Sequence, residues 1–237
     1  LLKSFDDKLN SPFSMNPSRF SSGPAPDFED STFSSGWTAS GSNVTAGTNV
    51  IDWNAASVSA HHAIAYDIGA GNISDSEWIL RFGLTFDNMV DTTGGGDRRF
   101  YLGFFAKNQS AKASATDDAI YLCLLNQGAV GDFRMQWNDG TAVRTGNTMT
   151  QFDEVDDPVA QTYYVEIVRS STTTGLISLY SDSDYSSLID SLAYVPTANV
   201  AGLRYLKFMS DDGSDGTGGS MDGTITDVKF YNAISSF

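Results

Sequence analysis

Apolar and polar residues alternate along most of the chain from Phe28 onward, with a period of two residues. The clearest example is EWILRFGLTFDN, residues 77–88, in which Arg81 and Thr85 fall on the polar face. The apolar face of this segment carries Trp78, Leu80, Phe82, Leu84 and Phe86. Because successive side chains of a β-strand point to opposite sides, the pattern predicts a strand with one face in a core.

Nine further segments have strand-like patterns, and Gly, Asn, Asp and Ser occupy nearly every junction between them. These segments are residues 49–54, 57–68, 98–108, 119–126, 132–139, 162–170, 175–182, 203–211 and 223–232. No stretch of a dozen residues carries a capped helical stripe, and the nearest, residues 182–195, is interpreted as a turn and a short strand. The chain is therefore predicted to be all-β, a two-sheet antiparallel jelly-roll sandwich of about 10–14 strands. A seven-stranded immunoglobulin-like domain has too few strands.

Residues 1–26 differ from this pattern, because they contain four of the six prolines and many serines. Such a composition is typical of extended, poorly packed chain. We interpret the segment as an arm or linker that precedes one domain at residues 27–237. Two alternatives stay open for the arm: a loose terminus, or a segment that packs on this or a neighbouring molecule and allows self-assembly.

The composition allows a sizeable core, since 41% of the residues are hydrophobic and 12% are aromatic. The formal net charge is −15 and the pI is near 4.2. A surface this acidic repels phosphate backbones and anionic lipids, so nucleic acid is not an expected partner. No apolar run approaches the ~18 residues of a membrane span, and membrane insertion is not expected either. The single cysteine, Cys123, excludes an internal disulfide and is expected to be buried.

The two ends of the predicted domain carry family motifs. DFEDSTFSSGWTASG (27–41) opens it, and LRYLKFMSDDGSDGTGGSMDGTITDVKFYNAIS (203–235) closes it. Together they resemble the concanavalin-A-like, or laminin-G-like, jelly rolls, whose closing strand is matched at Gly223, Ile225, Asp227, Val228, Tyr231 and Asn232. The resemblance implies the jelly-roll fold, an extracellular, cell-surface or virion setting, and a glycan or cell-surface ligand. It leaves the function open, because such domains include binders, adhesion modules and hydrolases.

The hydrolases of this superfamily resemble one another in a strand with three alternating carboxylates. The nearest match is QFDEVDDPV (151–159), where Glu154 and Asp156 share a face but Pro158 follows them. A proline there indicates the end of a loop rather than a central strand. His61 and His62 are adjacent and point to opposite faces, so they do not form a shared zinc site. We therefore expect no catalysis.

Calcium is the expected cofactor, because a structural calcium site is common among the jelly rolls that this chain resembles. The resemblance implies Glu29 or Asp30 of the opening turn, Asp227 of the closing strand and Gly47 as ligands. Carboxylates that close repel one another by about 1–3 kcal/mol in total, and no arginine is near in sequence. The alternative is an edge-strand carboxylate that is hydrogen-bonded to the opening turn.

A second acidic group lies in the glycine-rich loop before the closing strand. Asp211, Asp212 and Asp215 stand among glycines there, as carboxylate oxygens that Ca²⁺ accepts. The spacing is not that of an EF-hand, and the terminal bidentate glutamate of that motif is absent. Two interpretations stay open: a metal site, or a solvated hairpin tip.

A sugar-binding surface needs exposed aromatic rings for pyranose faces and planar polar groups for hydroxyls. The outward-facing candidates are Arg81, Tyr101, Arg134, Gln136, Tyr164 and Glu166, with Tyr205 and Asn138 as further ones. The alternative is that these are ordinary outward residues of solvated strands. Trp53, Trp78 and Trp137 belong to the predicted core and are not proposed as stacking platforms.

These observations favour a non-catalytic extracellular carbohydrate-binding or adhesion module of a surface or secreted protein. The alternative is a structural subunit of a surface layer, filament or virion that uses the arm, residues 1–26, for assembly. A glycan hydrolase is the third class. Deletion of the arm separates the first two, since a subunit should lose assembly whereas a lectin-like module should keep its ligand.

Overall fold

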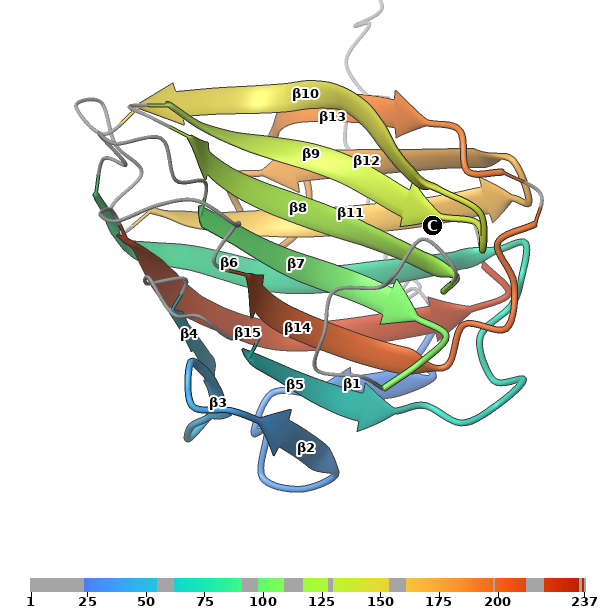
Figure 1. Ribbon diagram of the computed structural model, residues 1–237, viewed down its shortest axis with the longest axis horizontal. Helices are drawn as coiled ribbons and strands as arrows, with labels where there is room; N and C mark the ends of the chain where they lie inside the picture. The colour runs from blue at the N-terminus through green and yellow to red at the C-terminus, as the bar shows by residue number, and fades with distance from the viewer. Residues whose placement is uncertain are drawn as a thin grey trace, which may run out of the picture.

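The fold is a sandwich of two antiparallel β-sheets (Figure 1). The computed structural model describes residues 24–54, 62–90, 98–108, 117–127, 130–153, 161–197, 199–211, 220–234 and 236. Fifteen strands and no helix lie within these residues. The all-β jelly-roll prediction is confirmed. The strand number exceeds the expected range because β1 and β3 have three residues each and are too short to show a period.

One sheet has eight strands, in the order β13-β12-β11-β6-β15-β4-β3, and β1 also pairs with β15. Its strands are β1 (Phe28–Asp30), β3 (Val44–Ala46), β4 (Ile51–Asn54), β6 (Trp78–Val90), β11 (Thr162–Ser171), β12 (Thr174–Tyr180), β13 (Leu188–Tyr194) and β15 (Ser220–Asn232). The last strand of the chain therefore lies inside the sheet, between β6 and β4.

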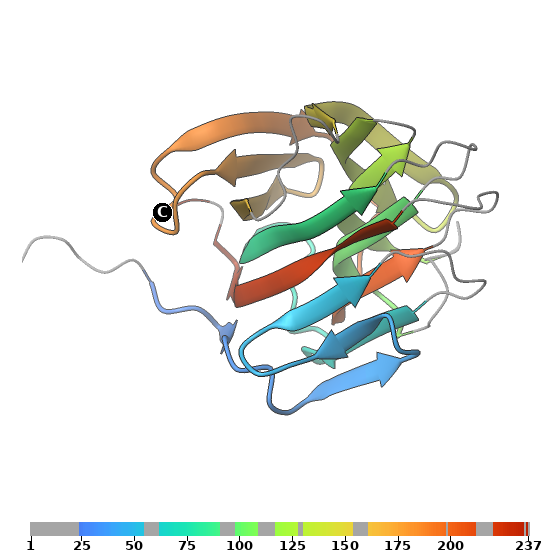
Figure 2. The same ribbon diagram turned by 90° about the vertical axis from the view of Figure 1, so that its left-hand side faces the viewer.

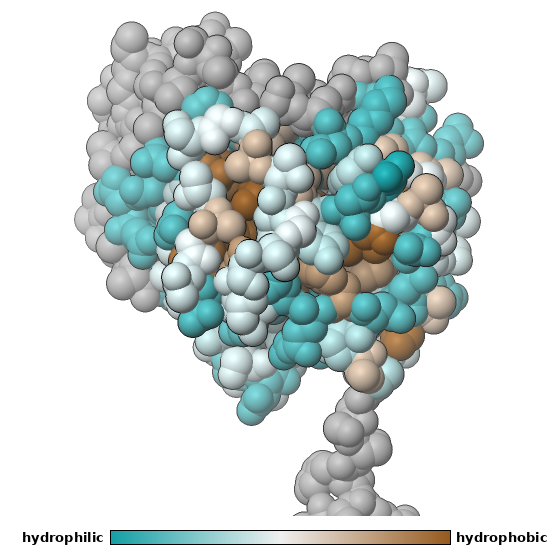
Figure 3. Space-filling model, turned by 90° about the horizontal axis from the view of Figure 1, so that it is seen from below, coloured by the Kyte–Doolittle hydropathy of each residue, from teal (hydrophilic) through white to brown (hydrophobic). Residues whose placement is uncertain are grey.

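The other sheet has seven strands, in the order β10-β9-β8-β7-β14-β5-β2. Its strands are β2 (Trp37–Ser40), β5 (His62–Asp67), β7 (Arg98–Phe105), β8 (Ala119–Gln127), β9 (Val130–Asn138), β10 (Val143–Asp153) and β14 (Tyr205–Asp211). Strands β7 to β10 follow one another as a meander, and β14 returns the chain to the centre of the sheet. The side of the molecule seen in Figure 3 is mostly hydrophilic, with small apolar patches.

The core lies between the inner faces of the two sheets, where the alternating apolar residues meet. Trp78 is fully buried and contacts Phe104 edge to face across the sheets. Trp53 stacks on Phe100 with 4.3 Å between ring centroids. Trp137 is buried in the same cluster, so all three predicted core tryptophans are confirmed. Full burial of one large apolar side chain contributes about 1.5–3 kcal/mol, which makes this cluster the main source of stability.

The two ends of the domain lie side by side, as Figure 2 shows for β1 and β15. The register joins Phe28 to Phe230 and Asp30 to Val228. The side chain of Asp27 also accepts a hydrogen bond from the backbone N–H of Asn232, at 2.7 Å. The expectation that the closing strand lies beside the opening turn is therefore confirmed. Residues 1–23 of the predicted arm lie outside the described residues.

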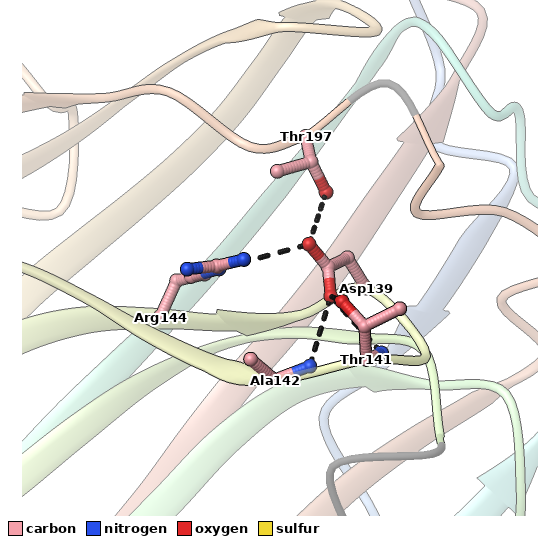
Figure 4. A network of polar contacts seen from close by, with 5 residues as sticks. All are labelled: Asp139, Thr141, Ala142, Arg144 and Thr197. Atoms are coloured by element: carbon pink, nitrogen blue, oxygen red, sulfur yellow. Dashed lines mark hydrogen bonds and ion pairs between the residues drawn. The ribbon is translucent and has the colours of Figure 1, made fainter.

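A polar network holds the chain where it crosses from β13 to β14 (Figure 4). One carboxylate oxygen of Asp139 accepts the backbone N–H of Thr141 at 3.1 Å and of Ala142 at 3.0 Å. The other oxygen accepts the hydroxyl of Thr197, at 3.1 Å, in the crossover itself. These hydrogen bonds, the one from the Thr141 hydroxyl above all, hold the pKa of Asp139 well below its usual value. The network joins the β9–β10 turn to the crossover.

Candidate functional site

A groove of about 710 Å³ is cut into the outer face of the eight-stranded sheet. We call it the tyrosine groove, since it is lined by Tyr180, Tyr185 and Tyr231, and its polar end contains Arg81, Glu166 and Asp184. These residues come from β6, β11, β12, the β12–β13 loop and β15. The groove therefore crosses four neighbouring strands, and its walls are made by a loop and by the two ends of the described chain, Pro24 and Ser236.

An ion pair forms the floor of this polar end. The register of β11 on β6 places Glu166 directly opposite Arg81. The Nε and Nη2 atoms of Arg81 lie 2.7 and 2.5 Å from Oε2 of Glu166. The two side chains are only 19% and 12% exposed, so water screens the pair weakly. Each charge satisfies the other, so the pair has no net charge, and Oε1 of Glu166 also accepts a hydrogen bond from the hydroxyl of Tyr180, at 3.5 Å.

Three tyrosine rings gather around the ion pair. The ring of Tyr185 covers the guanidinium of Arg81, at 4.3 Å from its centroid. Tyr185 also contacts the rings of Tyr164 and Tyr180, with centroid distances of 6.2 and 5.5 Å. Burial, and then the charge of Glu166, raises the pKa of Tyr180. Burial also raises the pKa of Tyr185 above its usual value. Both hydroxyls therefore stay protonated at physiological pH, as hydrogen-bond donors and acceptors.

Tyr185 reaches this position because the β12–β13 loop is held in one conformation. The carboxylate of Asp182 accepts backbone N–H groups of Asp184 and Ser186, both at 3.1 Å, and of Ser187 at 2.6 Å. Hydrogen bonds from Ser187 and Ser186 lower the pKa of Asp182 to about 2. Tyr185 itself has a φ of 56°, in the left-handed region that aromatic residues rarely adopt. The loop thus keeps a strained tyrosine against the sheet.

An apolar strip runs beside the ion pair. The register aligns Leu176 of β12, Val168 of β11, Ile79 of β6 and Tyr231 of β15. All four line the tyrosine groove, and Leu176 is 39% exposed. Neighbouring outward positions on a strand are about 7 Å apart, so the strip and the ion pair lie side by side. Ile79, Val168 and Tyr231 are only 1%, 8% and 6% exposed and Ile234 packs against them, so Leu176 is the exposed apolar side chain of this strip.

The structure divides the predicted ligand-binding residues between two surfaces. Arg81 and Glu166 line the tyrosine groove, and Tyr164 contacts the ring of Tyr185, which also lines it. Arg134 and Gln136 belong to β9 on the outer face of the other sheet. There, Arg134 pairs with Asp132 at 2.6 Å, and Gln136 donates to the hydroxyl of Thr145 at 3.2 Å. The predicted residues therefore do not form one site.

The prediction that Tyr101 is an exposed ligand-binding residue is wrong in one respect. Tyr101 faces outward from β7, as expected, yet its side chain is 0% exposed. It contacts Tyr121 edge to face with 5.2 Å between centroids, in a second buried cluster. The expectation of an exposed stacking platform at Tyr101 is wrong, because alternation gives the side of the sheet and not what covers it.

Local sequence patterns are a weaker guide to the other residues of the groove. Tyr231 belongs to the closing motif, and the alternation of its strand places Tyr180 on the outer face, so the sequence indicates both positions. Tyr185 and Asp184 lie in a turn, where no period applies. Only the folded loop brings Tyr185 over β6.

The predicted calcium ligands of the opening turn have other partners. Asp30 accepts the backbone N–H of Thr32 at 2.9 Å and of Phe33 at 2.7 Å, and the indole N–H of Trp37 at 2.8 Å. Burial alone raises the pKa of Asp30, but these hydrogen bonds outweigh it and lower the pKa. The carboxylate thus caps the opening turn, and both of its oxygens are engaged.

The remaining predicted ligands of this site are spread out. Glu29 lies on the other side of β1, where its Oε1 is 3.3 Å from Nζ of Lys229. A side chain at Gly47 would meet the carboxylate of Asp52. Asp227 is exposed, with a φ of 49°, at an irregularity of β15. Lysine therefore supplies the positive charge opposite Glu29, and calcium binding by this set stays a prediction.

Several other predicted residues fall at or beyond the described parts of the chain. Asp211 ends β14, whereas Asp212, Asp215, Glu154, Asp156 and His61 lie outside the described residues. His62 accepts backbone N–H groups of Ser42 and Asn43 at its Nδ1. Among the described residues, no group of three or more His, Cys, Asp or Glu side chains is arranged to hold a metal ion. The same residues contain no helix long and apolar enough to span a membrane.

Comparison with known proteins shows which solved structures have a similar fold. No protein-family model matches the sequence, and no curated protein matches it either. Among solved structures, the CBM2 module of Lactobacillus casei BL23 phage J-1 evolved Dit is 10% identical, with a TM-score of 0.55, over 90% of this chain and 98% of that one.

Two lectin-like structures are similar to a comparable degree. The legume lectin-like domain from Entamoeba histolytica is 10% identical, with a TM-score of 0.53, over 84% of this chain and 90% of that one. Arcelin-5, a lectin-like defence protein from Phaseolus vulgaris, is 12% identical, with a TM-score of 0.51, over 86% and 96% of the two chains. At these identities the likeness shows the fold, and the chain has the concanavalin-A-like jelly-roll fold.

Proposed function

We propose that this chain is a non-catalytic carbohydrate-binding module that holds its glycan in the tyrosine groove. The observation that carries the proposal is the meeting of Arg81 and Glu166 with the tyrosines that line one groove of a lectin-like fold, Tyr180, Tyr185 and Tyr231. Charged planar groups hydrogen-bond sugar hydroxyls, and aromatic rings contact the apolar faces of pyranoses. The names of the similar structures, a lectin-like domain and a CBM2 module, support the same class of ligand.

A glycan array tests the proposal with the wild type and two single variants. Tyr185→Ala removes the ring that covers Arg81, and we expect at least a tenfold loss of apparent affinity. Tyr205→Ala is the matched control, since Tyr205 is a half-buried tyrosine on the other sheet. Thermal melts of both variants show whether they are folded. A folded wild type that binds no glycan, or binds one with unchanged affinity in folded Tyr185→Ala, contradicts the proposal.

Absence of catalysis is part of the proposal and has its own measurement. Glu166, the carboxylate at the floor of the groove, is paired with Arg81 rather than with a second carboxylate. A retaining or inverting glycosidase needs two carboxyl groups across the scissile bond. Product release from a broad panel of polysaccharides should therefore equal the buffer blank. Turnover that is lost in Glu166→Gln or Glu154→Gln would overturn this part.

We propose a setting outside the cell, on a cell surface or a virion, where a glycan ligand is accessible. A second candidate function is a structural subunit of such an assembly, favoured by the likeness to a module of a phage protein. Deletion of residues 1–23 separates the two functions. Loss of assembly in sedimentation, with no glycan binding in either form, supports the subunit, whereas unchanged glycan affinity supports the binding module.

We also propose that a calcium ion binds at Asp227 and the opening turn. Thermal melting in EDTA and in millimolar calcium, for the wild type and Asp227→Ala, measures it directly. A calcium-dependent rise of the wild-type melting temperature that Asp227→Ala removes supports the site. An unchanged wild-type melting temperature contradicts it.

A further inference from the structure

We infer that two copies of this chain associate through β13, whose free edge pairs antiparallel with β13 of the second copy about a two-fold axis at Leu192. The inference is independent of the proposed function, because it concerns the edge of the sheet and not the ligand. Three observations carry it: exposed apolar side chains gather at this strand, its edge has less protection than the other sheet edges, and its outer row of side chains is uncharged and self-complementary.

Exposed apolar side chains gather at one end of the eight-stranded sheet. β13 is the end strand there and pairs with β12 alone among the described strands, at the top of the molecule in Figure 1. Leu188 and Ile189 of β13 are 56% and 42% exposed, and Val195, directly after the strand, is 66% exposed. Leu176 of the neighbouring β12 is also exposed, which leaves only Val143 of β10 elsewhere among the exposed large apolar residues that the structure describes. Single exposed apolar residues are common, but a gathered set marks an interaction surface.

The free edge of β13 also has less protection than the other edges. An edge strand can pair with another chain unless it is short, irregular or charged. Among the described strands, β1, β2 and β3 also pair on one side only, but they have three or four residues each. The pairing of β10 is interrupted by two irregularities. β13 has seven residues, contains no lysine or proline, and pairs regularly with β12 over Asp190–Tyr194. This edge is therefore the one best suited to the addition of a strand.

The one charged residue of β13 lies on its inner row. Ala193 is opposite Leu176, which lines the tyrosine groove, so Ala193 and Ser191 belong to the outer face and Asp190 to the inner one. The carboxylate of Asp190 accepts the backbone N–H of Ser191, at 2.7 Å. This contact engages a backbone donor of β13 within the strand itself. Asp190 therefore weakens the pairing of β13 with another strand, and its removal should strengthen that pairing.

The occupant is a second copy, because the order of side chains along β13 is self-complementary. Ile189, Ser191, Ala193 and Val195 form one row by alternation. Antiparallel pairing about Leu192 places Ile189 opposite Val195 and Ser191 opposite Ala193, and the two-fold axis makes each pair occur twice. The chain carries a formal charge of −15, so two copies repel each other over most of their surfaces. At this uncharged row they meet without like charges opposite each other.

Such a dimer has both tyrosine grooves on one side. Residues directly opposite each other in neighbouring antiparallel strands point to the same side, so the outer faces of the two copies form one continuous face. Neighbouring strands are about 4.8 Å apart, which separates the two β12 strands by about 14 Å. The consequence for binding rests on the proposed function: the dimer holds a glycan-coated surface at two points, and more tightly than one chain does.

Sedimentation equilibrium of the full chain, up to about 500 µM, tests the inference. We expect a monomer–dimer equilibrium whose association constant increases at least tenfold from about 20 mM to about 500 mM salt, because salt screens the repulsion between two acidic copies. Ile189→Asp and Val195→Asp should each weaken the dimer at least tenfold, and Asp190→Ala should strengthen it at least threefold. Ala46→Asp is the matched control, since it adds the same charge at an exposed position of β3, at the opposite end of the sheet. Thermal melts show whether each variant is folded.

Paired cysteines test the register. In a mixture of Ser191→Cys and Ala193→Cys chains, the two new cysteines are opposite each other, with Cα atoms about 4.5–5.5 Å apart, and a disulfide fits this distance. In either variant alone the two copies of the cysteine are diagonal neighbours, about 7–8 Å apart. Cys123 is buried in all of these proteins. We expect the mixture to form an interchain disulfide at least tenfold faster than either variant alone.

Each outcome supports or overturns the inference. A chain that is monomeric at every concentration, a dimer that weakens as salt increases, or a dimer that Ile189→Asp leaves unchanged overturns it. So does a disulfide that forms faster in either single variant than in the mixture. Glycan binding that Tyr185→Ala weakens is measured separately, so the proposed function stands if the dimer fails. A dimer with the expected properties and no bound glycan leaves this inference standing while the proposed function fails.

Discussion

The outer faces of the two sheets carry similar residues in different surroundings. On the eight-stranded sheet, Arg81, Glu166 and Tyr180 line an open groove. On the seven-stranded sheet, Tyr101 and Tyr121 are fully buried. They belong to a second cluster that contains Ala63, Tyr101, Phe105, Ala119, Tyr121, Cys123, Leu125 and Met209. One outer face therefore has room for a ligand, while the other serves as a second core.

The charged groups of the two faces differ in the same way. Arg81 has Glu166 as its partner and keeps part of its side chain in water. Lys207 of β14 is 0% exposed, with its Nζ 4.1 Å from the centroid of Phe105. Burial lowers the pKa of Lys207 to about 8, against the opposing charge of Asp117. Stability should therefore respond to the second cluster, and ligand binding to the groove.

The largest expected effect is a difference in stability between two tyrosine truncations. Tyr121→Ala removes a buried ring that stacks on Phe105, and it should lower the free energy of unfolding by about 3–5 kcal/mol. Tyr180→Ala removes a half-buried ring at the groove and should cost about 1 kcal/mol. Urea denaturation followed by fluorescence measures both. Equal costs would contradict the contrast between the two faces.

The next effect is a pH dependence specific to the seven-stranded sheet. The pKa of Lys207 is about 8 in the folded chain and about 10.4 when unfolded. Between these values the unfolded state binds more protons, so the stability contributed at this site rises with pH. The penalty of the buried charge is fully present below pH 8, and about 2–3 kcal/mol of it should be relieved by pH 10.4.

The measurement is the difference in unfolding free energy between the wild type and Lys207→Met at several pH values. Taking the difference cancels the titration of other groups. We expect the unfolding free energy of the wild type to increase relative to that of Lys207→Met as the pH rises from 8 to 10. A difference that does not change with pH would show that Lys207 titrates normally.

An intermediate effect is expected for the ion pair of the groove. Glu166→Gln leaves the guanidinium of Arg81 without its carboxylate and should cost about 1–3 kcal/mol. The double variant Arg81→Met/Glu166→Leu removes both charges and should be closer to the wild type than Glu166→Gln is. Urea denaturation of the wild type, Arg81→Met, Glu166→Leu and the double variant gives the coupling energy of the pair. If the changes in unfolding free energy of the two single variants add up to that of the double variant, the ion pair has no coupling energy and the expectation is contradicted.

The smallest effect concerns an exposed pair on the seven-stranded sheet. Arg204 donates to both carboxylate oxygens of Asp67, at 2.8 and 2.6 Å, and these hydrogen bonds lower the pKa of Asp67. The two side chains are 40% and 45% exposed, so water and salt screen them. Asp67→Asn should move the urea midpoint less than Glu166→Gln does. A larger shift of the urea midpoint in Asp67→Asn than in Glu166→Gln would contradict the expectation that the more exposed pair contributes less.

Local patterns predicted the strands but not their arrangement. The strand around Trp78 follows from its alternation alone, and burial confirms its apolar face. The pairing of Arg81 with Glu166, 85 residues later, depends on the register of two distant strands. No local pattern contains that register. Tyr185 was missed because its loop conformation depends on the carboxylate of Asp182, and Tyr101 was misplaced because exposure depends on tertiary packing.

The position of β15 has a consequence for how the protein is made. This strand, residues 220–232, leaves the ribosome after every other described strand, yet β6 and β4 both pair with it. Until it emerges, each of those strands has an open edge on which another chain can form a sheet. Such long-range pairing is also slow to form. The nascent domain therefore completes its eight-stranded sheet only after β15 has emerged, and loss of β15 adds two open edges, at β6 and β4, to the sheet.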